Sequence, residues 1–113
     1  MHELAVAEGI LDVLKKQVQD RILSVKLKIG EMSGVVPEAL EFSFQTASVG
    51  TLAEGASLII ERVPLTARCG DCAEVFKVQD YCFACAKCGG ANFKLITGRE
   101  LLIEEIEVED NKS

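Results

Sequence analysis

The sequence is poor in the residues from which enzyme active sites are usually built. Its 113 residues include a single histidine, and it shows neither a nucleophile placed beside a base nor a phosphate-binding loop. A catalytic zinc ion needs an open coordination position, and acid–base chemistry needs a positioned proton carrier. We therefore expect a protein that is not an enzyme.

Long apolar runs and an excess of basic charge are missing as well. No run approaches the roughly 20 apolar residues needed to cross a bilayer, and the first residues do not form a charged leader followed by an apolar stretch. The 12 basic and 18 acidic residues give a net charge of −6, whereas nucleic-acid binding requires a basic surface that neutralises phosphates. We expect a cytoplasmic protein that binds neither membranes nor nucleic acid.

What the sequence does have is five cysteines, four of which stand in two pairs. Cys69 and Cys72 form one pair and Cys85 and Cys88 the other, with two residues inside each pair. This spacing lets one tight turn direct two thiolates at one ion, and two such turns complete a tetrahedron with zinc–sulfur bonds of roughly 2.3 Å. The four cysteines therefore predict a structural Zn(II) site, in which no position is open to a substrate.

Other interpretations of the cysteines stay open at this point. Iron in a rubredoxin-like site uses the same four sulfur atoms, and disulfides are disfavoured by the odd cysteine count and the missing leader. Cys82 forms an overlapping pair with Cys85. We call the tight turn of one such cysteine pair a metal knuckle. It needs a residue that tolerates positive φ after the second thiolate, so Gly89 and Gly90 favour the pair Cys85 and Cys88. Cys82 is then a spare thiol.

Apolar periodicity predicts two helices and three strands outside the cysteine region. The helices follow from apolar residues at three-four spacing and, for the second, from a proline in its first turn and a closing glycine. The strands follow from strict alternation or from β-branched runs that stop at glycine or proline. The predicted helices cover residues 4–18 and about three turns from Pro37. The predicted strands cover residues 25–29, 56–63 and 101–109.

The last predicted strand carries two further expectations. Its apolar residues change parity midway, which predicts a β-bulge near Glu104 or Glu105. Its alternating glutamates complement the alternating Lys26 and Lys28 of the first strand, so we expect the two strands to pair with opposite charges facing each other. The glutamates concerned are Glu105, Glu107 and Glu109.

The order of these elements predicts an α+β fold with an insertion. We expect a small sheet of about three strands with two helices, interrupted by a zinc-knuckle domain similar to a zinc ribbon. The predicted domains are a discontinuous α+β domain of residues 1–67 and 99–113 and a zinc-binding domain of residues 68–98.

The only histidine is the second residue, immediately before a predicted helix. A single surface histidine is usually just a solvated side chain. Here the α-amino group of Met1, the His2 imidazole and the His2 backbone amide between them can bind one ion, and three nitrogen donors favour Ni(II) or Cu(II) over zinc. Glu3 can add a fourth donor or an offsetting charge. Met1, His2 and Glu3 therefore form a candidate site for a weakly held, releasable metal ion.

Several segments beside the cysteine pairs strengthen this hypothesis. They are Met1-His2-Glu3, Lys28-Ile29-Gly30-Glu31, Val36-Pro37-Glu38-Ala39-Leu40, Gly50-Thr51, Glu54-Gly55-Ala56 and Ile106-Glu107-Val108. With these segments the chain resembles, over essentially its whole length, the HypA/HybF family of hydrogenase maturation nickel metallochaperones. The resemblance implies Ni(II) carried by Met1, His2 and Glu3, and Zn(II) held by Cys69, Cys72, Cys85 and Cys88. It also implies delivery, together with a HypB-like maturation GTPase, to the large subunit of [NiFe]-hydrogenase.

The sequence departs from the family pattern at three positions. Ala5 stands where many members have serine, Val36 where some have an acidic residue, and Ala86 where proline is frequent. Position 36 therefore supplies no additional carboxylate ligand, and Glu38 is a weak substitute. The rival hypothesis is a zinc-knuckle adaptor that binds another protein and transfers no nickel. In either case we expect a monomer or a weak homodimer.

Overall fold

The computed structural model describes residues 3–79 and 82–109 and shows an α+β protein. The predicted fold class, with two helices and a three-stranded sheet beside a cysteine module, is confirmed. No helix in these ranges is long and apolar enough to span a membrane. In chain order the elements are α1 (Glu3–Gln17), β1 (Ile22–Gly30), α2 (Pro37–Ala47), β2 (Ser57–Val63), β3 (Thr66–Cys69), β4 (Val75–Lys77), β5 (Phe93–Thr97) and β6 (Leu101–Val108).

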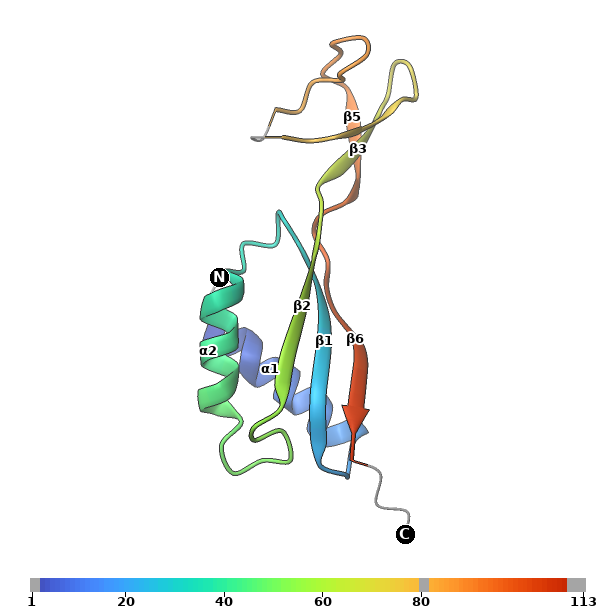
Figure 1. Ribbon diagram of the computed structural model, residues 1–113. Helices are drawn as coiled ribbons and strands as arrows, with labels where there is room; N and C mark the ends of the chain where they lie inside the picture. Colours follow the sequence, from blue (N-terminus) through green and yellow to red (C-terminus); the bar gives the residue numbers. More distant parts are fainter. Residues whose placement is uncertain (1–2, 80–81, 110–113) are drawn as a thin grey trace. The chain divides into compact units, whose positions relative to one another are not determined.

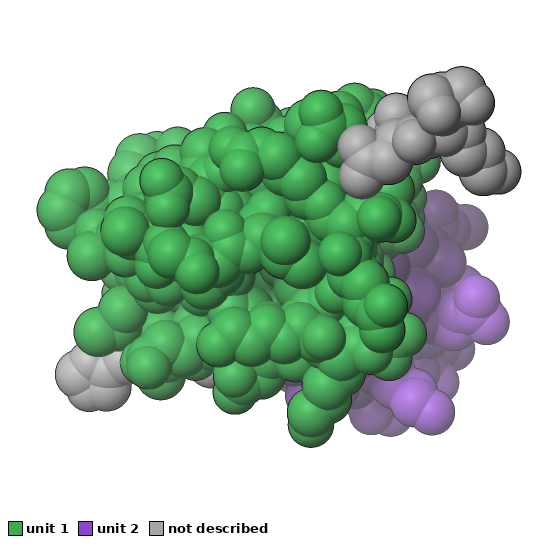
Figure 2. Space-filling model, turned by 90° about the horizontal axis from the view of Figure 1, so that it is seen from below, with its two compact units in different colours: residues 1–28, 34–61, 102–113 green, residues 29–33, 62–101 purple. Residues whose placement is uncertain are grey.

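The chain divides into two compact units, coloured separately in Figure 2. The first unit comprises residues 1–28, 34–61 and 102–113, and the second comprises residues 29–33 and 62–101. The second unit thus takes in the short segment 29–33 from the end of β1 besides the cysteine region. The assignment of nickel binding to residues 1–67 and 99–113 and of zinc binding to residues 68–98 stays a prediction.

The first unit is built on a sheet with the strand order β2-β1-β6, and α1 and α2 lie on one face of it (Figure 1). Side chains alternate along β1: Val25 and Leu27 are buried, whereas Lys26 and Lys28 are only partly buried. This alternation follows from the pleat of a strand and is why β1 could be predicted from sequence. The helices complete the core with Ala7, Ile10, Leu11 and Leu14 from α1 and Leu40 and Phe44 from α2.

Strand β6 lies beside β1 as predicted, but the charges on the sheet meet differently. The Nζ atoms of Lys26 and Lys28 lie 3.7 and 3.5 Å from carboxylate oxygens of Glu104. They also lie 3.6 and 3.9 Å from those of Glu61 on β2. The predicted partners Glu105, Glu107 and Glu109 were therefore wrong, because the lysines of the central strand reach the nearest carboxylate on each neighbouring strand. The pairs are partly exposed and contribute little individually.

The change of parity predicted along β6 is visible in its burial. Ile103 is half-buried and Glu104 belongs to the charged cluster, whereas farther along Ile106 and Val108 are half-buried and Glu105 and Glu107 are exposed. The inward-facing positions thus shift from odd to even numbers. The bulge that would produce this shift stays a prediction.

The second unit contains an antiparallel sheet with the strand order β4-β3-β5. Ala67 of the central strand lies opposite Phe76 on one side and Leu95 on the other. The core of this unit is small, and two of its buried residues are cysteines. It consists of Leu65, Ala67, Cys69, Phe76, Val78 and Cys85, with Phe83 and Leu95 packed against it.

Two glycines in the second unit allow a close approach of backbone segments. A Cβ atom on Gly30 would overlap the backbone carbonyl of Gly98. Gly98 itself has a φ of 118°, and a Cβ there would lie 2.8 Å from the Cα of Leu65. The N–H of Met32 donates to the Gly98 oxygen at 2.7 Å, which holds the segments together. Positions 30 and 98 therefore each require glycine.

Candidate metal centre

Four cysteine sulfur atoms meet in the second unit. The Sγ atoms of Cys69, Cys72, Cys85 and Cys88 all lie within 4.8 Å of one another. The Sγ of Cys69 is 3.6 Å from that of Cys88, and the Sγ of Cys72 is 3.6 Å from that of Cys85. The two pairs predicted from their spacing and from the glycines after Cys88 are thus brought together, with sulfur atoms from both pairs facing one centre.

The spacing of these sulfur atoms fits a tetrahedral thiolate site. Zinc–sulfur bonds of roughly 2.3 Å in a regular tetrahedron place the sulfur atoms about 3.8 Å apart. The two close pairs, at 3.6 Å, agree with this value. All five cysteines are free, so the disulfide interpretation is not supported. The cluster is therefore a four-cysteine metal-binding group.

The backbone of each knuckle directs N–H groups at sulfur. The N–H of Asp71 donates to the Sγ of Cys69 at 3.4 Å. The N–H of Lys87 donates to the Sγ of Cys85 at the same distance. In each pair the first sulfur thus accepts from the residue two positions later. Such donors stabilise a thiolate more than a thiol, so the two loops are built alike to hold anionic sulfur.

The thiols of the cluster differ in acidity. Hydrogen bonding to the backbone N–H groups of Cys88 and Lys87 and to neighbouring thiols lowers the pKa of Cys85 to about 7. The N–H of Glu74 lowers the pKa of Cys72, but desolvation and the surrounding cysteine thiols outweigh it and raise that pKa to about 12. An incoming cation must therefore displace at least the Cys72 proton, and its affinity decreases as the pH falls.

Cys82 lies outside the cluster, within the part of the chain that the structure describes. Its side chain is exposed, and its N–H donates to the carbonyl of Gln79 at 2.9 Å. Gly89, directly after the second knuckle, has a φ of 73°. The positive φ anticipated after Cys88 is therefore present, and the spare position of Cys82 agrees with the pairing inferred from it.

The first knuckle also has a positive φ directly after its second cysteine, at a residue that was not predicted from the sequence. Ala73 follows Cys72 with a φ of 63°, although left-handed backbone costs an L-residue roughly 1–2 kcal/mol. We expect Ala73→Gly to raise the free energy of unfolding of the metal-loaded second unit by about 0.5 kcal/mol, because glycine removes the strain but gains entropy in the unfolded chain. We expect Gly89→Ala to lower it by about 1 kcal/mol.

Denaturant unfolding of the metal-loaded variants measures both effects. A Cβ on Gly89 meets no atom within 4 Å, so the change there tests backbone conformation alone. A lower unfolding midpoint for Ala73→Gly than for the wild-type chain would contradict the strain at this position.

Of the three residues predicted to bind nickel, Met1 and His2 lie outside the described residues. Glu3 is the first residue of α1 and is half-buried. Its Oε2 accepts a hydrogen bond from the N–H of Val36, 33 positions away, at 3.0 Å. Sequence reasoning missed this contact. The available signal was a valine immediately before Pro37, because valine has no side-chain oxygen with which to cap a helix.

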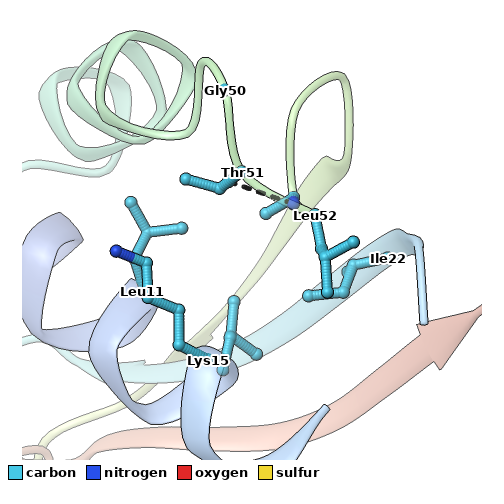
Figure 3. Close-up of a pocket in the computed structure, with 8 residues that line it drawn as sticks. Leu11, Lys15, Ile22, Gly50, Thr51 and Leu52 are labelled. Atoms are coloured by element: carbon cyan, nitrogen blue, oxygen red, sulfur yellow. Dashed lines mark hydrogen bonds between the residues drawn. The ribbon is translucent and has the colours of Figure 1, made fainter. Parts of the chain in front are cut away.

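A cavity of about 440 Å³ in the first unit is a second candidate site (Figure 3). The Thr51 hydroxyl donates to the carbonyl of Ser48 at 2.6 Å and accepts from the N–H of Ala53 at 3.1 Å, so it serves its own loop. Lys15 is the charged residue of the lining. Without converging polar groups this cavity indicates no chemistry. Its lining consists of Leu11, Leu14, Lys15, Ile22, Gly50, Thr51, Leu52 and Ala53.

A helix-covered sheet joined to a four-cysteine module defines a small metal-binding α+β protein, and sequence comparison identifies its family. The family model described as "Hydrogenase/urease nickel incorporation, metallochaperone, hypA" matches residues 1–108. The chain is 47% identical over 110 residues to the hydrogenase maturation factor HypA of Geobacter sulfurreducens, which covers 96% of this chain and 100% of that protein. It is 40% identical over 119 residues to HypA of Streptomyces avermitilis, covering 100% of this chain and 91% of the relative.

A solved structure shows the same relationship. The solution structure of the Ni metallochaperone HypA from Helicobacter pylori matches with a TM-score of 0.66 at 26% identity and covers 96% of this chain and 97% of that one. The chain therefore belongs to the HypA family of hydrogenase maturation metallochaperones. The resemblance inferred from sequence is confirmed. Because the family acts as a maturation factor, the protein is not an enzyme and its partners are hydrogenase-related.

Proposed function

We propose that this protein is a cytoplasmic nickel carrier that delivers Ni(II) to the large subunit of [NiFe]-hydrogenase together with a HypB-like GTPase. The observation that carries the proposal is the match of residues 1–108 to a family described by nickel incorporation. The relatives named as hydrogenase maturation factors support hydrogenase as the recipient.

Nickel is the cargo in this proposal, and Met1, His2 and Glu3 form its site. The α-amino group, the His2 imidazole and the His2 backbone amide supply nitrogen donors in a chelate that suits a tetragonal ion. Such donors bind Cu(II) more tightly than Ni(II), so affinity alone does not select nickel. Selectivity then depends on the metal supply and on the partner proteins.

The four-cysteine group holds a structural Zn(II) in this proposal. The sulfur separations of 3.6 Å support a tetrahedral thiolate site. A closed tetrathiolate has no position for a substrate, so its role is to fold the module of residues 68–98. The nickel site belongs to the other domain, residues 1–67 and 99–113.

Calorimetric titration of the untagged protein with Ni(II) tests the carrier function. We expect His2→Ala to weaken binding at least about a hundredfold, because the substitution removes the chain's only imidazole. Acetylation of the Met1 amine should weaken binding to a similar degree. We expect the affinity of the wild-type chain to decrease as the pH falls from about 8 to about 6, since both nitrogens must lose protons before they bind.

The control and the rival hypothesis use the same titration. Glu8→Gln changes an exposed glutamate of α1 and should leave nickel binding unchanged. Equal nickel uptake by the wild-type chain and His2→Ala would refute the carrier site and favour the zinc-knuckle adaptor.

A further inference from the structure

Glu3, the first residue of α1, is hydrogen-bonded to the residue that precedes α2. The N–H of Val36 donates to its carboxylate at 3.0 Å. Val36 is the N-cap residue of α2, with φ −90° and ψ 115°, and makes no side-chain cap hydrogen bond. Pro37 follows at the first helical position and has no N–H. The Glu3 carboxylate therefore lies at the N-terminus of α2, where the helix dipole favours a negative group.

This contact fixes the position of Glu3, the residue that follows His2 in the chain. Both helices are anchored in the core of the first unit, α1 through Leu11 and Leu14 and α2 through Leu40 and Phe44. The hydrogen bond joins the beginnings of two packed elements. Holding Glu3 in place reduces the conformational entropy that Met1 and His2 lose when they bind a metal.

The electrostatics of the contact oppose a ligand role for the same carboxylate. A cation is disfavoured at the N-terminus of a helix, where the N–H groups carry partial positive charge. An anion bonded to an N–H at that terminus offsets this charge while it stays in place. A nickel ion that drew the carboxylate away would leave the start of α2 without this partner.

We propose that Glu3 is a positioning residue of the nickel site: its carboxylate holds the start of α1 on the Val36 N–H and does not bind the nickel ion. The proposal rests on the proposed function and specifies the role of one of its three residues. Nitrogen donors of Met1 and His2 then form the coordination sphere on the protein side, and Glu3 determines where they stand.

Two substitutions break the contact from opposite sides. Glu3→Ala removes the carboxylate. Val36→Pro removes the N–H donor but keeps Glu3 and the Val36 carbonyl, which accepts from the N–H of Leu40 at 3.0 Å. The φ of −90° at Val36 is close to the range of proline. Glu3→Gln is the conservative variant, because its amide oxygen still accepts a hydrogen bond. Glu8→Ala is the matched control on the same helix.

The readouts are Ni(II) affinity by calorimetry and the ligand-field spectrum of the bound ion, both with an untagged chain. We expect Glu3→Ala and Val36→Pro each to weaken nickel binding about tenfold, a size typical of groups that orient metal ligands. The double variant should lose no more than either single variant, and the spectrum should not change. Glu3→Gln should stay within about threefold of the wild-type chain, since the hydrogen bond persists. Glu8→Ala should match the wild-type chain.

Several results would overturn the assignment. Wild-type affinity in Val36→Pro would show that this hydrogen bond does not position the nickel site, and a changed nickel spectrum in Glu3→Ala would make the carboxylate a ligand. If circular dichroism shows that Val36→Pro loses helix, the conservative variant decides, and Glu3→Gln binding as weakly as Glu3→Ala overturns the proposal. A wild-type chain that takes up no nickel refutes the proposed function and this role together, whereas the other outcomes refute the Glu3 assignment alone.

Discussion

Replacing Cys72 by serine is expected to unfold the second unit while the first unit keeps its fold. Among the residues that the structure describes, the buried core of the second unit has six members, and Cys69 and Cys85 are two of them. Cores this small rarely support a fold without a metal or disulfides. Binding of a structural zinc ion contributes roughly 10–16 kcal/mol of apparent free energy. Loss of one thiolate removes much of this contribution and leaves the remaining sulfur atoms without a closed site.

Metal analysis and amide NMR spectra of the purified variant measure this result. Cys82→Ser is the matched control, because Cys82 is also exposed but lies outside the cluster. We expect the control to retain one zinc per chain and a wild-type spectrum. Dispersed signals from Phe76 and Val78 in zinc-free Cys72→Ser protein would show that the core folds without the metal and would contradict the prediction.

Gly30→Ala is expected to lower the free energy of unfolding by at least about 3 kcal/mol. The added Cβ would overlap the backbone carbonyl of Gly98, and backbone cannot move aside as a flexible side chain can. The N–H groups of Gly30 and Met32 donate to the oxygens of Glu100 and Gly98 at 2.8 and 2.7 Å. Separating the segments enough to admit a methyl group would strain or break both hydrogen bonds.

Gly9→Ala is the matched control for this substitution. Gly9 lies within α1, and a Cβ there meets no atom within 4 Å. Alanine at a helix interior should raise the free energy of unfolding by about 0.5–1 kcal/mol. Urea unfolding followed by far-ultraviolet circular dichroism compares the two variants. A loss of less than about 1 kcal/mol for Gly30→Ala would show that the close approach of backbone is not required.

Features that depend on neighbours along the chain could be predicted from sequence. The alternation around Lys26 and Lys28 located β1. The apolar spacing of Leu11 and Leu14 and of Leu40 and Phe44 located the buried faces of the two helices. The two-residue gaps within the cysteine pairs, together with the glycines that follow Cys88, indicated which sulfur atoms would meet. These patterns reflect the pitch of a helix, the pleat of a strand and the reach of a tight turn, all of which are local.

Features that join distant segments could not be predicted in this way. The choice of Glu61 and Glu104 as lysine partners depends on the register of three strands. The short strands of the metal module, such as β4 with three residues, are too brief to show a pattern. Ala73 has an ordinary side chain, and its φ of 63° follows from the turn that closes around the metal site.

The sequence by itself determined the α+β class, the four clustered cysteines and membership of the HypA family, because periodicity, spacing and motifs are properties of short, continuous segments. Only the tertiary structure decided that the Glu3 carboxylate accepts a hydrogen bond from the Val36 N–H. It also decided that the backbone of Gly98 approaches Gly30 too closely for a side chain. These contacts join residues far apart in the chain, so their geometry arises when packing brings the segments together.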